Sequence, residues 1–293
     1  DIDLEWMDPK IEEISQDMAA KFDAILLNLP KATKKSIERS DCRLKIISRF
    51  GVGFDSVDIE AMKEKNIIVT NTPNAVRRPV AVASLTFIFA LSGRLFLKDN
   101  LVRSNRWKER TNFMGQGLTK KTLGIVGCGS IGSELIRLSK NFFNQIVSYD
   151  PYVLETEMKI KGANKVQLLE LASESDFVVV LCNLNRETFG LIDKNFFNNM
   201  KREAFIINMS RGPVINENDL IEALENQRIE GAGLDVFNKE PIEINNKLLS
   251  LDNTILTPHA LCWTDECFSD IADEAIQSIL DFIDKKEIKN KVN

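Results

Sequence analysis

Short apolar runs rich in β-branched residues alternate with amphipathic stretches along the whole chain. This alternation is typical of parallel α/β sheets, in which helices connect successive strands. In the first third of the chain the pattern predicts three strands and two helices. The strands are expected at residues 23–29, 45–49 and 67–71, and the helices at 58–65 and 81–95.

A second series of strands and helices begins at residue 123. Strands are expected at 123–127, 145–149, 176–181, 204–208 and 229–235, and helices at 130–141 and 216–226. These elements suffice for a complete nucleotide-binding sheet. Near the end of the chain, residues 264–285 place apolar side chains three and four positions apart, which predicts one long amphipathic helix.

The length of 293 residues indicates two domains at roughly 150 residues each. A polar stretch from Lys98 to Gly117 is the expected boundary. The longest uncharged apolar stretch, Pro79 to Gly93, is shorter than the roughly 18–20 residues that span a bilayer, so it predicts a buried helix. Because no basic segment followed by an apolar stretch opens the chain, we expect no secretory signal; the first residue is not Met, so an N-terminal piece is expected to be missing.

Charge and cysteine content exclude several classes of function. A formal net charge of −5 argues against a nucleic-acid or anionic-membrane surface as the main partner. Five cysteines without a CxxC pair fit neither a disulfide framework nor a zinc site, and they favour a reducing, cytoplasmic setting. The chain has one histidine, His259, which excludes a multi-histidine metal centre. We therefore expect no metal site.

A glycine-rich GxGxxG sequence lies directly after the predicted strand at 123–127 and opens the next helix. Gly127 allows the tight turn, Gly129 lets the backbone approach a pyrophosphate, and Gly132 lets helix and strand pack closely. The amides of Ser130 and Ile131 then lie at a helix N-terminus, which favours an anion. Alone the glycine pattern is weak, because such turns also serve packing.

An acidic residue strengthens this interpretation. Asp150 ends the next predicted strand, 18 residues after Gly132. A carboxylate at this place accepts hydrogen bonds from the ribose hydroxyls of NAD and repels the 2′-phosphate of NADP. Neither Pro151 nor Tyr152 could neutralise that phosphate. We therefore predict an NAD site, although Asp150 could instead merely cap a strand end.

Further motifs follow one another in a recognisable order. They are Gly-Val-Gly at 51–53 with Asn-Thr-Pro at 71–73, Ser-Arg-Gly-Pro at 210–213, Gly-Leu-Asp at 233–235, Lys-Glu-Pro at 239–241 and Thr-Pro-His at 257–259. With these motifs the chain resembles the D-isomer-specific 2-hydroxyacid dehydrogenases, which include phosphoglycerate dehydrogenase and the glyoxylate and hydroxypyruvate reductases. The resemblance covers nearly the whole chain, from about residue 22 to the end.

The resemblance implies two Rossmann-like α/β domains. A doubly wound NAD-binding domain, residues 98–263, is inserted into a flavodoxin-like substrate domain made of residues 1–97 and 264–293, the N-terminal part of which is expected to be incomplete. It also implies a homodimer and a small 2-oxo or 2-hydroxy acid as substrate.

Reduction of a 2-oxo acid needs particular groups, whatever the family. A guanidinium can hold the carboxylate and polarise the carbonyl, and Arg211 follows a strand whose end should face the nicotinamide. The carbonyl oxygen must also gain a proton, and His259 is the imidazole available to give it.

Other roles rest on the resemblance. Glu240 would orient His259 and favour its protonated form, Asp235 and Met209 would contact the cofactor, and the backbone of Val52 and Gly53 would hold the substrate carboxylate.

The sequence also departs from the family and leaves rival functions open. Residues 182–185 replace a proline-containing turn, and Val82 stands where a glutamate is common. Trp263 follows the histidine, but one aromatic side chain does not settle the substrate. Formate oxidation on the same scaffold pairs the histidine with an amide, so Glu240 counts against it. A non-enzymatic NAD-sensing regulatory protein is the other rival, which the catalytic residues alone do not exclude.

Overall fold

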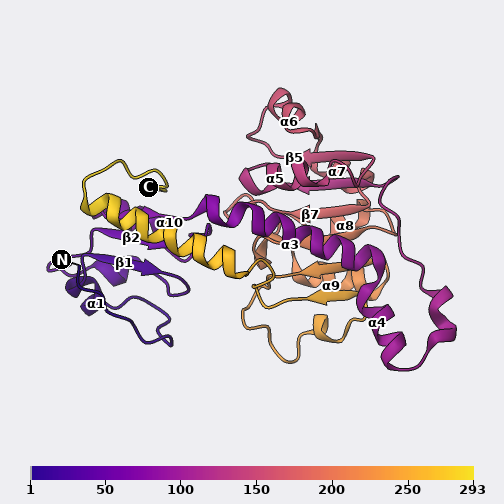
Figure 1. Ribbon diagram of the computed structural model, residues 1–293, viewed down its shortest axis with the longest axis horizontal. Coiled ribbons are helices and arrows are strands. Elements are labelled where there is room, and N and C mark those ends of the chain that lie inside the picture. The colour runs from indigo at the N-terminus through magenta and orange to yellow at the C-terminus, as the bar shows by residue number, and fades with distance from the viewer. Residues whose placement is uncertain (1) are drawn as a thin grey trace. The chain divides into compact units, whose positions relative to one another are not determined.

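The computed structural model describes residues 2–293, and the chain forms two compact units (Figure 1). Unit 1 comprises Asp1–Val76 and Thr264–Asn293, and unit 2 comprises Arg77–Trp263. The first division lies earlier than the predicted boundary at residue 97. The reason is that the apolar helix before that boundary packs into unit 2, and the polar stretch after it folds as part of unit 2 as well.

Unit 1 is built on a three-stranded parallel sheet in the order β1-β2-β3. Its strands are β1 (Ala24–Leu27), β2 (Ile46–Arg49) and β3 (Ile68–Thr70), and its helices are α1 (Gln16–Lys21), α2 (Ile59–Glu64) and α10 (Asp265–Ile283), with a 3₁₀ turn η1 (Lys34–Ile37). The predicted strands and the closing helix are confirmed.

The two chain segments of unit 1 pack together through β2 and α10. Buried side chains such as Leu27, Ile47 and Val69 form the apolar core around the sheet. The hydroxyl of Ser48 in β2 donates to the carbonyl of Ala275 in α10 at 2.9 Å, so a buried polar pair links helix and sheet. The closing helix is therefore an integral part of this unit.

Unit 2 is built on a seven-stranded parallel sheet in the order β10-β9-β8-β7-β4-β5-β6. The strands are β4 (Thr122–Val126), β5 (Gln145–Tyr149), β6 (Asn164–Lys165), β7 (Phe177–Val180), β8 (Phe205–Asn208), β9 (Gly231–Leu234) and β10 (Thr254–Leu256). The strand order reverses beside β4, which has β5 on one side and β7 on the other. In open parallel sheets, dinucleotides bind outside the carboxyl ends of the strands at such a reversal.

Seven helices of the described chain accompany this sheet, the first of which begins in the last residues of unit 1. They are α3 (Pro73–Gly93), α4 (Leu95–Arg103), α5 (Ser130–Ser139), α6 (Glu155–Lys161), α7 (Leu168–Glu174), α8 (Lys194–Asn199) and α9 (Glu217–Glu225). The 3₁₀ turns are η2 (Trp107–Asn112), η3 (Gly212–Val214) and η4 (Lys247–Ser250). The predicted doubly wound sheet is thus confirmed.

Helix α3 is longer than its predicted range, because it begins at Pro73 and continues through Pro79. It is long and apolar enough to cross a membrane by length and composition, but 61% of its apolar window is buried inside the protein. The Phe87 ring packs against the backbone of Gly233 in β9. The prediction of a buried helix is confirmed.

Candidate active site

The glycine-rich turn follows β4, and two of its glycines are required by the packing of the protein. Gly127 has a φ of +98°, and a Cβ there would lie 2.7 Å from the backbone nitrogen of Cys182 at the end of the neighbouring strand. A Cβ on Gly132 would lie 2.2 Å from the carbonyl oxygen of Gly127. Both positions therefore exclude every other residue.

Gly129 differs from these two glycines. A Cβ on Gly129 would meet no atom of the described chain within 4 Å, and its φ of −69° suits any residue. Gly129 is the N-cap of α5, so the first N–H groups of that helix, including those of Ser130 and Ile131, face this space. A side chain there would fill the place from which a pyrophosphate can reach these donors. The turn fits a dinucleotide.

Asp150, directly after β5, is held beside the same turn. Its Oδ2 accepts a hydrogen bond from the backbone N–H of Cys128 at 2.8 Å, and its Oδ1 accepts one from the N–H of Tyr152 at 2.9 Å. Each carboxylate oxygen has a further lone pair that can accept from a ribose hydroxyl. These two backbone hydrogen bonds therefore orient the carboxylate at the carboxyl end of β5.

One residue near this turn escaped the sequence argument. The ammonium of Lys161, the last residue of α6, donates to the carbonyl of Cys128 at 2.9 Å. Both backbone groups of Cys128 are thus held by charged side chains, Asp150 on one side and Lys161 on the other. Lys161 reaches the turn from the helix that follows Asp150 and not from the residues directly after it.

Two thiols lie at the turn, Cys128, which is buried, and Cys182, which is partly buried. Burial raises the pKa of Cys128, and it raises the pKa of Cys182 to about 11. Thiols that resist ionisation are poor nucleophiles. The departure from the family pattern at residues 182–185 therefore places an inert, apolar side chain beside the glycine turn.

The three predicted catalytic residues follow three neighbouring strands. Arg211 comes after β8, Glu240 after β9 and His259 after β10, and these strands lie side by side and parallel. Their carboxyl ends share one edge of the sheet with the glycine turn. The His259 Nδ1 lies 2.7 Å from the Glu240 Oε2, so the predicted pair forms.

Glu240 is held in its ionised form. Burial raises the pKa of Glu240, but the hydrogen bonds from His259 and from the backbone N–H of Phe237, together with the charges of His259 and Arg211, outweigh it, so that the net pKa is lowered. The Phe237 N–H reaches the Oε1 at 3.0 Å, which leaves the Oε2 for the imidazole.

The backbone fixes Arg211 beside this pair. A Cβ on the following residue, Gly212, would lie 2.0 Å from the carbonyl carbon of Phe237, so only glycine allows the loops after β8 and β9 to approach so closely. The Arg211 guanidinium donates to the carbonyl of Ser210 at 2.8 Å.

Asp235 is almost fully buried and organises the loop that carries His259. Its Oδ1 accepts from the Thr257 hydroxyl and from the backbone N–H groups of Ala260 and Leu261, at 3.0 and 3.1 Å for the two amides. Burial raises the pKa of Asp235. Asp235 was predicted only to contact the cofactor. The structure shows that it also supports the loop that carries His259. Met209, also predicted to contact the cofactor, is buried after β8.

The remaining predicted residues lie in unit 1. Val52 and Gly53 belong to the loop that follows β2. Among the described residues, no group of three or more His, Cys, Asp or Glu side chains could hold a metal ion.

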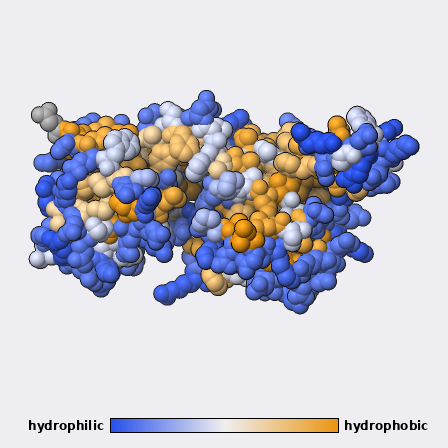
Figure 2. Space-filling view, turned by 90° about the horizontal axis from the view of Figure 1, so that it is seen from below, coloured by the Kyte–Doolittle hydropathy of each residue, from blue (hydrophilic) through white to orange (hydrophobic). Residues whose placement is uncertain are grey.

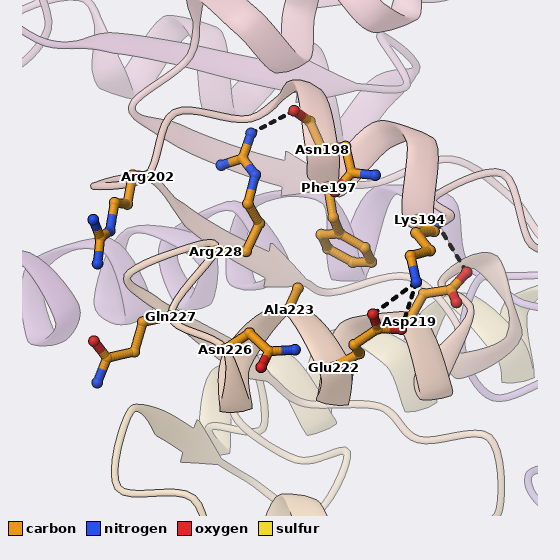
Figure 3. A pocket seen from close by; sticks show the side chains of 10 residues that line it. All are labelled: Lys194, Phe197, Asn198, Arg202, Asp219, Glu222, Ala223, Asn226, Gln227 and Arg228. Carbon is orange, nitrogen blue, oxygen red and sulfur yellow. Dashed lines mark hydrogen bonds and ion pairs between the residues drawn. The ribbon is translucent and has the colours of Figure 1, made fainter.

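A separate groove of about 600 Å³ lies between α8 and α9 (Figure 3). Its Lys194 is paired with Glu222 at 2.7 Å, and Arg228 donates to the backbone carbonyl of Asn198. None of the predicted site residues lines it. The groove therefore gives no support to a cofactor site away from the sheet edge.

Comparisons with known proteins agree with this geometry. Residues 85–260 match the family model described as D-isomer specific 2-hydroxyacid dehydrogenase, NAD binding domain. A glyoxylate reductase of Thermococcus litoralis is 35% identical over 98% of this chain and 89% of its own length.

Solved structures agree as well. A glyoxylate reductase from Paecilomyes thermophila is 28% identical, with a TM-score of 0.84 over 92% of this chain and 83% of that one. An acyclic imino acid reductase, solved with NADPH and D-arginine, is 25% identical, with a TM-score of 0.86 over 95% of this chain and 88% of that one.

Proposed function

Since the chain belongs to the D-isomer specific 2-hydroxyacid dehydrogenase family, we propose that it reduces a small 2-oxo acid to the D-2-hydroxy acid with NADH. The observation that carries this proposal is the 2.7 Å contact between His259 and Glu240 at the sheet edge that also holds the glycine turn. The name of the Thermococcus relative makes glyoxylate the first substrate to test.

Three side chains have separate roles in the reduction of the substrate. Arg211 binds the carboxylate and polarises the carbonyl, because a guanidinium offers a planar fork of donors. The nicotinamide supplies the hydride when it is bound. His259 gives a proton to the carbonyl oxygen, and Glu240 holds the imidazole in place and favours its protonated form.

The cofactor is a nicotinamide dinucleotide, and we propose NAD in preference to NADP. The negative charge of Asp150 beside the glycine turn supports NAD, because it would repel a 2′-phosphate. The positive charge of the Lys161 ammonium at the same turn has the opposite effect, because it would attract a 2′-phosphate. Met209 and Asp235 keep their predicted roles at the nicotinamide end, and Val52 and Gly53 keep theirs as donors to the substrate carboxylate.

We also propose a cytoplasmic homodimer that pairs through unit 2. In favour of this pairing, α4 and the turn η2 carry large apolar side chains that are exposed to solvent. They are Leu95, Phe96, Val102 and Trp107. On the face shown in Figure 2, hydrophobic residues, in orange, lie among hydrophilic ones, in blue.

The function is tested by following NADH oxidation with a panel of 2-oxo acids that includes glyoxylate and hydroxypyruvate. We expect turnover with at least one of them. Replacing His259 with Asn should lower kcat by about a hundredfold or more, the usual size of a general acid–base contribution, with little change in NADH affinity.

The rival functions give different results in the same assays. Tight NADH binding without turnover of any 2-oxo acid would favour the NAD-sensing regulatory protein. Formation of NADH from NAD and formate would favour the formate-oxidising rival, against which the carboxylate of Glu240 counts.

A further inference from the structure

A side-chain hydrogen bond joins the two loops that flank the glycine turn of unit 2. The Tyr152 hydroxyl, in the loop after β5, donates to the carboxylate of Glu187, in the loop after β7. Strands β5 and β7 are the two neighbours of β4, which ends in the glycine turn. The pair therefore connects the loops on the two sides of that turn.

This connection lies on the side from which a dinucleotide approaches the sheet. Dinucleotides bind outside the carboxyl ends of the strands, with the pyrophosphate at the N-terminus of the helix after the glycine turn. Both loops leave their strands at these carboxyl ends. Tyr152 also follows Asp150, the residue predicted to bind the ribose, by two positions. The bond therefore spans the adenosine side of the proposed cofactor site.

The backbone around Tyr152 is held, whereas its ring is open to solvent. The N–H of Tyr152 donates to the Asp150 Oδ1 at 2.9 Å, and the carbonyl of Val153 accepts from the Lys165 ammonium at 2.5 Å. Tyr152 itself is 75% exposed, so packing constrains its ring little. The hydrogen bond to Glu187 raises the pKa of Tyr152, and the hydroxyl therefore keeps its proton and remains a donor.

A hydrogen-bonded turn presents Glu187 from the opposite loop. The Asn185 Oδ1 accepts from the N–H groups of Glu187 at 2.8 Å and Thr188 at 3.0 Å, and the Thr188 hydroxyl donates to the carbonyl of Asn183 at 2.6 Å. Such turns order a loop without burying it. Both partners of the bond thus start from fixed backbone, so rotation of exposed side chains is enough to break the bond and to form it again.

We propose that Tyr152 and Glu187 form a strap across the cofactor site, which must open each time the dinucleotide enters or leaves. The strap forms in the free protein and again over the bound adenosine. It slows association and dissociation by the same factor, because binding that does not change the strap equilibrium is not changed by it. The proposal rests on the proposed function only in taking a nicotinamide dinucleotide as the ligand.

The charge of Glu187 has a separate effect that the test must remove. A carboxylate beside the path of a pyrophosphate slows its approach electrostatically, with or without a strap. Tyr152→Phe removes the hydrogen bond and keeps the charge, whereas Glu187→Ala removes both. Tyr152→Phe is therefore the informative single variant.

The test follows NADH fluorescence by stopped flow, which measures the association and dissociation rate constants without turnover. In Tyr152→Phe we expect both to rise by about threefold to tenfold, the usual effect of losing one hydrogen bond, with Kd within about twofold of the parent. The control is Glu155→Ala, which removes an exposed carboxylate at the start of α6, three residues after Tyr152, and should match the parent.

A double variant tests whether the two side chains act as a pair. Glu187→Ala should accelerate association more than Tyr152→Phe does, because it also removes the charge. Adding Tyr152→Phe to Glu187→Ala should then change neither rate constant, since the bond is already lost.

Several results would overturn the strap. Unchanged rate constants in Tyr152→Phe, additive effects in the double variant or a parent that does not bind NADH would each do so. Faster dissociation alone, with a higher Kd, would show instead that the hydroxyl contacts the bound cofactor. Failure of every 2-oxo acid as a substrate would count against the proposed function and leave these binding rates as they are, so the two proposals fail separately.

Discussion

His259 owes its place to backbone geometry as well as to Glu240. Its φ of 54° lies in the left-handed region, which is uncommon for a residue other than glycine. The Asp235 carboxylate binds the two N–H groups that follow it, and the N–H of His259 itself donates to the carbonyl of Thr257 at 3.0 Å. Asp235 therefore holds the backbone of the turn, and Glu240 holds the imidazole itself.

Replacing Glu240 with Gln should slow reduction by loosening the imidazole. The pKa of Glu240 is lowered, so its carboxylate is charged at working pH, and its Oε2 lies 2.7 Å from the His259 Nδ1. An amide oxygen makes a weaker hydrogen bond to the ring than a charged carboxylate does. In 2-oxo acid reduction we expect kcat to fall about tenfold or more, with little change in NADH affinity. An unchanged kcat would show that Glu240 does not position the ring.

Replacing Asp150 with Ala should weaken NADH binding more than NADPH binding. The carboxylate can accept from the ribose hydroxyls of NADH, whereas it repels the 2′-phosphate of NADPH. Since Asp150 also holds the Cys128 N–H, both affinities will fall through the loosened turn, and the ratio of the two dissociation constants is the informative quantity. Lys161→Gln, which also loosens the turn, should shift this ratio the opposite way. An unchanged ratio in Asp150→Ala would contradict the assignment to the ribose.

At the scale of elements, periodicity predicted the strands and helices that bury a full apolar face. It failed where tertiary contacts decide. β6 has two residues and pairs only with β5, and β10 is a short edge strand beside β9, so neither leaves a periodic pattern of its own. Pro79 predicts a helix start, but the residues before it, 73–78, are helical as well. The Glu274 carboxylate accepts a hydrogen bond from the N–H of Ala75, so a tertiary contact supports this first part of the helix.

In the candidate site, too, the sequence predicted some residues, and others depend on tertiary contacts. The motifs predicted Arg211, Glu240 and His259 because each follows a strand in a recognisable sequence, and the geometry joins His259 to Glu240. The contact of Lys161 with the glycine turn could not be predicted in this way. Its ammonium binds a backbone carbonyl from a separate helix, and such a contact depends on the fold and not on the spacing of residues.

The packing of α3 on the sheet of unit 2 can be tested at Gly233. A Cβ there would lie 2.8 Å from the ring of Phe87, which is fully buried and must therefore shift. We expect Gly233→Ala to lower the free energy of unfolding by about 1–3 kcal/mol, the usual cost of overpacking. Combining it with Phe87→Leu, which vacates the space of the ring, should make the two changes non-additive.

Urea denaturation measures these differences, and Gly117→Ala is the matched control. A Cβ on Gly117 meets no atom within 4 Å, so this variant should resemble the parent. Equal stability of Gly233→Ala and the parent would mean that α3 can move away from β9 without cost.

At the scale of the whole molecule, each unit has its own parallel sheet and its own apolar core. The chain leaves unit 1 within α3 and returns to it at α10, so the smaller unit is assembled from both ends of the sequence. Every residue predicted to bind the dinucleotide or to transfer a proton belongs to unit 2, and Val52 and Gly53, the predicted donors to the substrate carboxylate, belong to unit 1.

The proposed homodimer can be tested on the exposed apolar side chains of unit 2. Phe96 and Val102 of α4 are exposed to solvent, and apolar side chains clustered on a surface are typical of an interface. Replacing both with Glu would place two charges in that interface. By analytical ultracentrifugation at micromolar concentration we expect the parent to sediment as a dimer and the double variant as a monomer. Ile160→Glu, on the exposed side of α6, should remain dimeric. A monomeric parent, or a double variant that stays dimeric, would exclude pairing through this surface.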